Sequence, residues 1–125
     1  MIGSSAPRML GLLARYAEIW NGWGIQTVEQ VLQCRDKVDA AMTAAGRDPV
    51  TVERSVALLV DFPDGTGRPS EREVIGLKAR TPEELAEHLI RYAEAGIGHV
   101  QLMLDPNTLG GLESAARALE YLDRL

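Results

Sequence analysis

The run Ser55-Val56-Ala57-Leu58-Leu59-Val60 (SVALLV) is almost continuously apolar. Such a run is typical of a parallel strand buried on both faces, whereas a half-exposed antiparallel strand alternates apolar and polar residues. A polar stretch over residues 61–70 follows, and Thr81-Pro82-Glu83-Glu84 then predicts a helix start. The threonine caps this helix, the proline takes its first position and the second glutamate returns the capping bond. Together these segments predict one strand-then-helix unit, and Gly96 ends its helix.

Three further units of the same kind flank this one. They comprise a strand stub at Met1-Ile2 with a helix from Pro7 to Ala17, a strand at Ile19-Trp20-Asn21 with a helix from Thr27 to Gly46, and a strand His99–Leu104 with a helix that uses Leu112, Ala116, Leu119 and Leu122.

The alternation of strands and helices predicts an α/β fold with a parallel sheet, in a single domain over residues 1–125. Four units form either an open sheet with helices on both faces or half of a TIM (β/α)8 barrel, because a whole barrel takes about 250 residues. In a half-barrel all helices lie on one side, so the other face and both sheet edges are left unpaired. Such a surface does not stay exposed to water.

Composition narrows the function classes. The formal net charge of −5 argues against binding to nucleic acid or to an anionic membrane. The single cysteine, Cys34, excludes an internal disulfide and fits a reducing cytoplasm. No apolar run reaches the length of a membrane span, and the first residues do not resemble a signal peptide. With only His88 and His99, a histidine-based metal site or a Ser-His-Asp triad has little support, and we expect no metal.

Three stretches of the chain resemble a known family. They are IGSSAPRMLGLLARYAEIWNGWG (residues 2–24), AAGRDPVTVERSVALLVD (residues 44–61) and TPEELAEHLIRYAEAGIGHVQLMLDPNTLGGLE (residues 81–113). In this order they resemble the C-terminal half of bacterial luciferase-like monooxygenases, in particular members that use flavin or deazaflavin. The resemblance implies units five to eight of a (β/α)8 barrel and an oxidoreductase that uses FMN or the deazaflavin coenzyme F420.

The resemblance also implies where a cofactor phosphate is held. Gly3, Ser4 and Ser5 match the family's phosphate loop, although Ser4 stands where a second glycine is expected. Free backbone N–H groups at the start of the following helix favour an anion, and Arg8 adds positive charge there. The alternative interpretation is an ordinary Gly/Ser turn before a helix.

Trp20 and Asn21 lie in the region that lines the cofactor and substrate cavity of the family. The resemblance implies that an indole stacks on the cofactor ring and that Asn21 hydrogen-bonds to it; the alternative is that the tryptophans belong to the core. Asp61 and Asp105, which end two strands, are interpreted as turn or cap residues rather than as an acid/base pair. Catalytic residues stay unknown, because in the family they come mostly from the early strands.

Both faces of the two strongest strands are mostly apolar. Burial of even one large apolar side chain is worth about 1.5–3 kcal/mol, so an open sheet face favours association. We therefore expect a homodimer that completes the barrel. The alternatives are a non-catalytic self-associating half-barrel and a truncated piece of a longer enzyme. In the polar stretch before Thr81, Val74-Ile75-Gly76-Leu77 predicts either an added strand or a lid.

Overall fold

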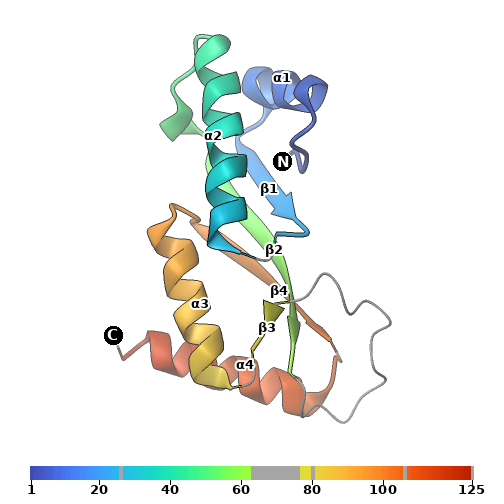
Figure 1. Ribbon diagram of the computed structural model, residues 1–125, viewed down its shortest axis with the longest axis vertical. Coiled ribbons are helices and arrows are strands. Elements are labelled where there is room, and N and C mark those ends of the chain that lie inside the picture. Colours follow the sequence, from blue (N-terminus) through green and yellow to red (C-terminus); the bar gives the residue numbers. More distant parts are fainter. Residues whose placement is uncertain (26, 63–76, 80, 106, 125) are drawn as a thin grey trace.

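The computed structural model describes residues 1–25, 27–62, 77–79, 81–105 and 107–124 (Figure 1). Its elements, in chain order, are α1 (Pro7–Tyr16), β1 (Ile19–Trp23), α2 (Val28–Ala44), the 3-10 helix η1 (Pro49–Thr51), β2 (Glu53–Asp61), β3 (Leu77–Lys78), α3 (Pro82–Glu94), β4 (His99–Asp105) and α4 (Leu109–Leu122). From α1 onward the predicted order of strands and helices is confirmed, and the strands extend slightly beyond the apolar runs that indicated them, whereas the predicted strand at Met1-Ile2 is only an isolated bridge at Ile2.

The sheet is parallel throughout, and β1, β2 and β4 lie side by side in the order of the sequence. β2 is the central strand: it pairs with β1 along Glu53–Ala57, with β4 along Ser55–Asp61 and with β3 at Val60-Asp61. Because a strand has only two edges and β4 takes one of them, β1 and β3 must share the other, end to end. An isolated parallel bridge from Ile2 to Trp20 adds the N-terminal segment outside β1.

The helices form one layer. α1 contacts α2, α2 contacts α3 and α3 contacts α4, so each helix lies beside its neighbour in the sequence (Figure 1). A doubly wound sheet would instead divide its helices between two faces. A sheet in sequential order, covered by one layer of helices, is consistent with a section of a (β/α)8 barrel.

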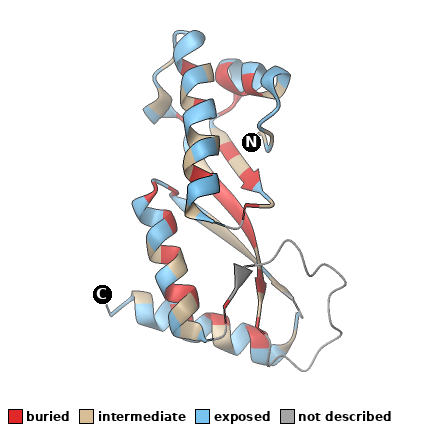
Figure 2. Cartoon of the chain, in the orientation of Figure 1, coloured by how far each residue is buried: buried red, intermediate tan, exposed pale blue. Residues whose placement is uncertain are grey.

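The core lies between this layer and the sheet. Val56, Leu58 and Val60 of β2 are fully buried and alternate along the strand, so they share the face that the helices cover. Figure 2 shows buried residues concentrated on β1, on β2 and on parts of the helices. The helices contribute the following fully buried apolar residues: Leu13, Val31, Val38, Met42, Leu85 and Tyr92.

Threonine caps begin three of the four described α-helices. The side chains of Thr27, Thr81 and Thr108 each accept a hydrogen bond from the backbone N–H three residues further on. At Thr27 the reciprocal bond from Gln30 completes a capping box, as the sequence predicts. Gly96 follows α3 with a φ of +86°, a left-handed conformation that glycine adopts without steric cost.

Residues 63–76 lie outside the described residues, so the expectation of a strand or lid there is not tested beyond Leu77. Leu77–Lys78 do form a short strand, β3. Among the described helices, none is long and apolar enough to cross a membrane.

Candidate functional site

Trp20 lies on the helix-covered face of β1. It is 1% exposed, and its indole Nε1 donates a hydrogen bond to the carbonyl oxygen of Ser4 at 3.3 Å. In the sheet register Trp20 pairs with Arg54, whose guanidinium donates to Asp39 on α2 at 2.5 Å. These contacts place both side chains on the helix side. The buried Trp20 ring favours the alternative that this tryptophan belongs to the core, and a contact of Trp20 with a cofactor stays a prediction.

Asn21 lies on the opposite, open face of the sheet. The hydroxyl of Ser55 is 2.9 Å from Asn21 Oδ1 and 3.2 Å from the carbonyl oxygen of Trp20. Trp23, two residues after Asn21, shares this face and is 57% exposed. The accessible indole at the end of β1 is therefore that of Trp23. The sequence carried a signal for this, because residues 20 and 23 differ in parity and must lie on opposite faces of a strand.

The Gly3-Ser4-Ser5 loop continues directly from the segment that pairs with β1. Ile2 donates to the carbonyl oxygen of Ile19 at 2.9 Å and accepts from the backbone N–H of Asn21 at 3.0 Å. A Cβ placed on Gly3 would lie 3.0 Å from the Asn21 carbonyl oxygen, so a glycine permits this close approach. The backbone of Asn21 is thus next to the loop, while its side chain points to the open face.

The N-terminus of α1 differs from those of the other described α-helices. Its cap residue is Ala6, no side chain caps it, and no acidic residue occupies its first turn. The Ser4 hydroxyl accepts from the Ala6 backbone N–H at 3.1 Å, which orders the loop just before the helix. Arg8 is exposed in the first turn. Unpaired N–H groups and a cation at this end favour an anion.

The structure thus brings four of the six predicted cofactor residues together: Gly3, Ser4, Ser5 and Arg8 lie in one loop and helix start. Asn21 contributes its backbone beside that loop.

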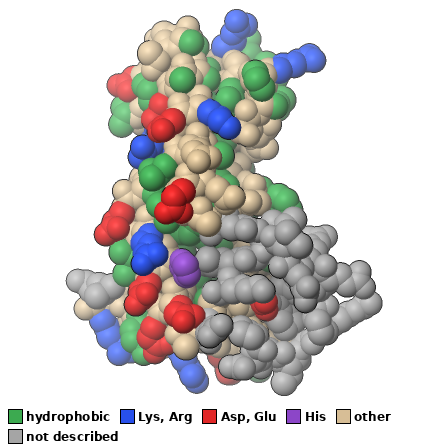
Figure 3. Space-filling view, viewed as in Figure 1, with side chains coloured by type: hydrophobic (Ala, Val, Ile, Leu, Met, Phe, Trp, Pro, Cys, Tyr) green, Lys and Arg blue, Asp and Glu red, His purple; other side chains and the backbone are tan. Residues whose placement is uncertain are grey.

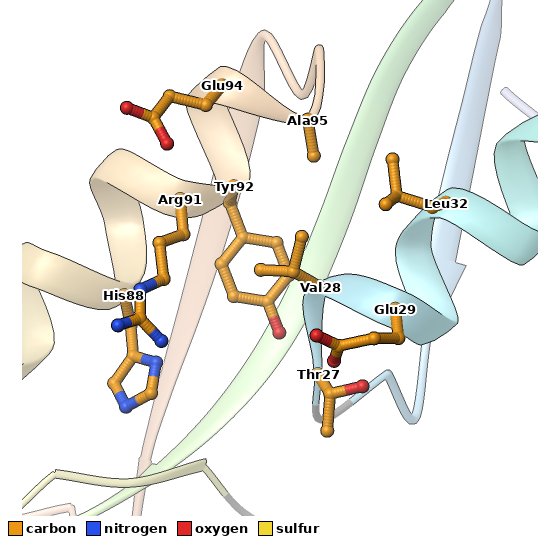
Figure 4. A pocket seen from close by; sticks show the side chains of 9 residues that line it. All are labelled: Thr27, Val28, Glu29, Leu32, His88, Arg91, Tyr92, Glu94 and Ala95. Atoms are coloured by element: carbon orange, nitrogen blue, oxygen red, sulfur yellow. The ribbon is translucent and has the colours of Figure 1, made fainter.

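A cavity of 560 Å³ lies elsewhere, between the start of α2 and the end of α3 (Figure 4). The Tyr92 ring stands between the two helices, and its buried hydroxyl has no hydrogen-bond partner among the described residues. Burial, reinforced by the negative charge of Glu29, raises the pKa of the Tyr92 hydroxyl. Hydrogen bonds from its own backbone N–H and from Thr27 lower the pKa of the Glu29 carboxyl. The sequence did not predict this cavity, because it arises where two separate helices diverge.

Charged side chains are interspersed over the helical face. Figure 3 shows acidic and basic groups interspersed among the described residues of the face in view, without a continuous basic patch on that face. In the same part of the chain, no three His, Cys, Asp or Glu side chains are grouped so as to hold a metal ion.

Comparison with solved structures places this geometry in context. A long-chain alkane monooxygenase (LadA) superposes with a TM-score of 0.74 at 14% identity, over 98% of this chain and 40% of that chain. A riboflavin lyase (RcaE), solved with modified FMN and riboflavin, gives 0.70 at 12% identity, over 98% and 42%. The fold of this chain is similar to part of each of these structures. An F420-dependent secondary alcohol dehydrogenase, solved with an F420-acetone adduct, gives 0.67 at 15% identity, over 93% and 46%.

At these identities the luciferase-like likeness is one of fold. The chain spans less than half the length of each of the three structures. No family model and no curated protein matches the sequence.

Proposed function

We propose that this chain is a luciferase-like half-barrel of the oxidoreductase or monooxygenase type that binds FMN or F420 through the cofactor's phosphate. The Gly3–Ser5 loop and the first turn of α1 hold that phosphate. When bound, such a cofactor supplies two-electron redox chemistry; the residues named here bind and orient it.

The observation that carries the proposal is the uncapped start of α1. The other three α-helices each satisfy an N-terminal N–H with a threonine side chain, and α2 and α3 also carry acidic residues in their first turns. At the start of α1 neither a capping side chain nor an acidic residue is present, and the exposed Arg8 lies in the first turn instead. A positive side chain at the positive end of a helix is unfavourable by itself, and a bound phosphate offsets that repulsion.

Fewer residues are placed to contact the ring system of the cofactor than its phosphate. Trp20 is buried against the helices, so stacking on the ring falls to the exposed Trp23 of the open face. Two features of the fold support a flavin-type ligand: the likeness to structures solved with FMN or F420, and the position of Trp23 at the carboxyl end of a strand, where barrels place their chemistry.

A fluorescence titration with FMN, F420 and riboflavin tests the proposal. Riboflavin lacks the phosphate, so we expect FMN to bind more tightly than riboflavin and inorganic phosphate to compete with it. Arg8→Gln weakens FMN binding about two- to fivefold, as expected for one exposed charge near an anion. Lys37→Gln, which removes a positive charge from an exposed position on α2, serves as the matched control.

Ser4→Asp places a negative charge inside the loop and weakens FMN binding about tenfold, equivalent to 1.4 kcal/mol. Gln33→Glu adds the same charge on α2 and leaves binding unchanged. Equal affinity for FMN and riboflavin, or no binding of either FMN or F420 at high micromolar concentration, would contradict the proposal.

A second candidate function is a non-catalytic module whose activity is self-association. The burial of Trp20 favours it, because one of the six predicted cofactor contacts is then unavailable. This candidate predicts an oligomer in solution and no change in flavin fluorescence at any cofactor concentration tested.

A further inference from the structure

Most of the exposed large apolar side chains of the described residues lie at the two ends of the series of elements and on the open sheet face. Among the described residues, α2 and α3 contribute none, and Val50 in η1 is the one member outside these regions. The others are Met1, Leu12, Tyr16, Trp23, Met103, Leu109, Leu112, Leu119 and Tyr121.

On α1 these residues form a stripe beside the buried side. Leu10, Leu13 and Ala14 are buried, whereas Tyr16 is 75% exposed. At about 100° per residue, the half-buried Met9 and the exposed Tyr16 lie together on one flank, the one that corresponds to the Tyr121 flank of α4, which reaches the preceding helix α3. We name Met9, Leu12 and Tyr16 the α1 stripe.

On α4 the exposed residues form a matching stripe on the opposite flank. Leu112 and Leu119 are 58% and 51% exposed and are seven residues apart, as are Met9 and Tyr16 on α1. Gly111, Ala115 and Ala118 are buried. Tyr121, whose hydroxyl donates to Glu83 of α3, lies on the other side of the helix, so Leu112 and Leu119 lie on the flank that faces away from α3. We name Leu112, Ala116 and Leu119 the α4 stripe.

The sheet edges below these helices are also open. β4 pairs with β2 on one side, and within the described residues no other strand pairs with it. At the other end, the isolated bridge at Ile2 is the outermost pairing. Unpaired backbone groups on an edge strand attract another strand.

We propose that a second copy of this chain covers both stripes, with the α4 stripe of each copy packed against the α1 stripe of the other. The two-fold axis runs along the strands. Every strand in the sheet is parallel, and only an axis in that direction continues a parallel sheet from one copy to the next. Two copies supply eight strand-and-helix units, the number that closes a barrel.

Charge on the two helices fits this partner. α1 carries Arg8 and Arg15 and no acidic residue. The two glutamates of α4, Glu113 and Glu120, are exposed and, like the two arginines, are seven residues apart. With Arg117 included, α4 has a formal charge of −1 and α1 has one of +2, so the opposite signs favour α1 against α4, whereas like charges disfavour α1 against α1.

The first test is the solution mass without any cofactor, so that its failure is separate from a failure of cofactor binding. We expect twice the chain mass of 13.6 kDa by light scattering. Leu112→Asp lowers the mass toward that of one chain while the circular dichroism spectrum is unchanged. Val50→Asp changes an even more exposed apolar residue outside the stripes and leaves the mass unchanged.

The second test asks which helices lie together in the dimer. It measures disulfide formation between introduced cysteines in a glutathione buffer, in chains that also carry Cys34→Ser. When the Tyr16→Cys variant is mixed with the Leu119→Cys variant, we expect a disulfide that joins one chain of each. Neither variant alone forms a cross-linked dimer. A mixture of Tyr16→Cys with Gln33→Cys is the control and does not cross-link. A monomer, a polydisperse aggregate, or a dimer that cross-links through one stripe alone would overturn the proposal.

Discussion

At the scale of single residues, Gly22 has less room for a side chain than any of the other described glycines with a known clearance. A Cβ on this glycine would lie 2.9 Å from Cη2 of Trp20 and would overlap Cδ1 of Ile25. The Trp20 ring fills the space above β1 that a side chain at residue 22 would need.

Gly22→Ala is therefore expected to lower the free energy of unfolding by about 1–3 kcal/mol, the usual cost of overpacking a core. Urea unfolding followed by tryptophan fluorescence measures it. Gly98→Ala is the control, because a Cβ there meets open space. Equal stability of the two variants would contradict the packing described for Trp20.

Tyr92 gives a second prediction at this scale. Its hydroxyl is buried without a hydrogen-bond partner, an arrangement that costs free energy. Tyr92→Phe keeps the ring and removes the hydroxyl, so we expect the free energy of unfolding to rise by about 1 kcal/mol. A decrease would show that the hydroxyl is bonded in solution.

The pH dependence of stability has a definite sign at Tyr92. Its pKa in the folded chain is raised, so the folded state favours the neutral hydroxyl. The contribution of this pKa difference to the free energy of unfolding is present below the unfolded pKa of about 10 and is lost as pH rises through the folded pKa. The Phe variant, measured by the same urea unfolding at increasing alkaline pH, loses less stability than the parent chain.

Single residues also show where sequence reasoning stops. The parity of residues 20 and 23 placed one tryptophan on each face of β1. Which face each takes depends on the pairing of Trp20 with Arg54 and on the position of α2, and both are properties of the folded chain. A propensity or a motif carries no such information.

At the scale of elements, the absent cap of α1 offers a test that links stability to binding. Ala6 has extended backbone angles, φ −67° and ψ 138°, which suit an aspartate cap.

Ala6→Asp is expected to raise the free energy of unfolding by about 0.5–1 kcal/mol through the new cap and its favourable charge. It is also expected to weaken FMN binding, because the carboxylate takes the N–H groups that the phosphate needs. Thermal unfolding and the fluorescence titration measure the two effects. A variant that gains stability and keeps full FMN affinity would place the phosphate elsewhere.

Most elements could be predicted because their signals are local. The SVALLV run indicated β2, and the threonines at residues 27 and 81 indicated the starts of α2 and α3. The hydrogen bond from the Tyr121 hydroxyl to the Glu83 carboxylate, which ties α4 to the first turn of α3, could not be predicted. It joins residues of two helices, and no pattern within either helix indicates it.

At the scale of the whole molecule, the choice between an open sheet and a half-barrel was left undecided by the sequence. Apolar strands and amphipathic helices are common to both arrangements. The contacts between successive helices favour the barrel section, because they place all four helices in one layer. Within the described ranges, no helix covers the other sheet face and no further strand pairs with the two outer strands, and the expectation of a homodimer, still a prediction, depends on this.

The direction of the helices has a practical consequence for building larger molecules. Each helix returns antiparallel to the strand before it, so α4 ends at the end of the sheet where the strands begin (Figure 1). In a closed pair, the first strand of one copy starts beside the last turn of the other. Two genes joined in tandem through a short spacer would then encode both halves in one polypeptide, and unfolding of that product would no longer depend on its concentration.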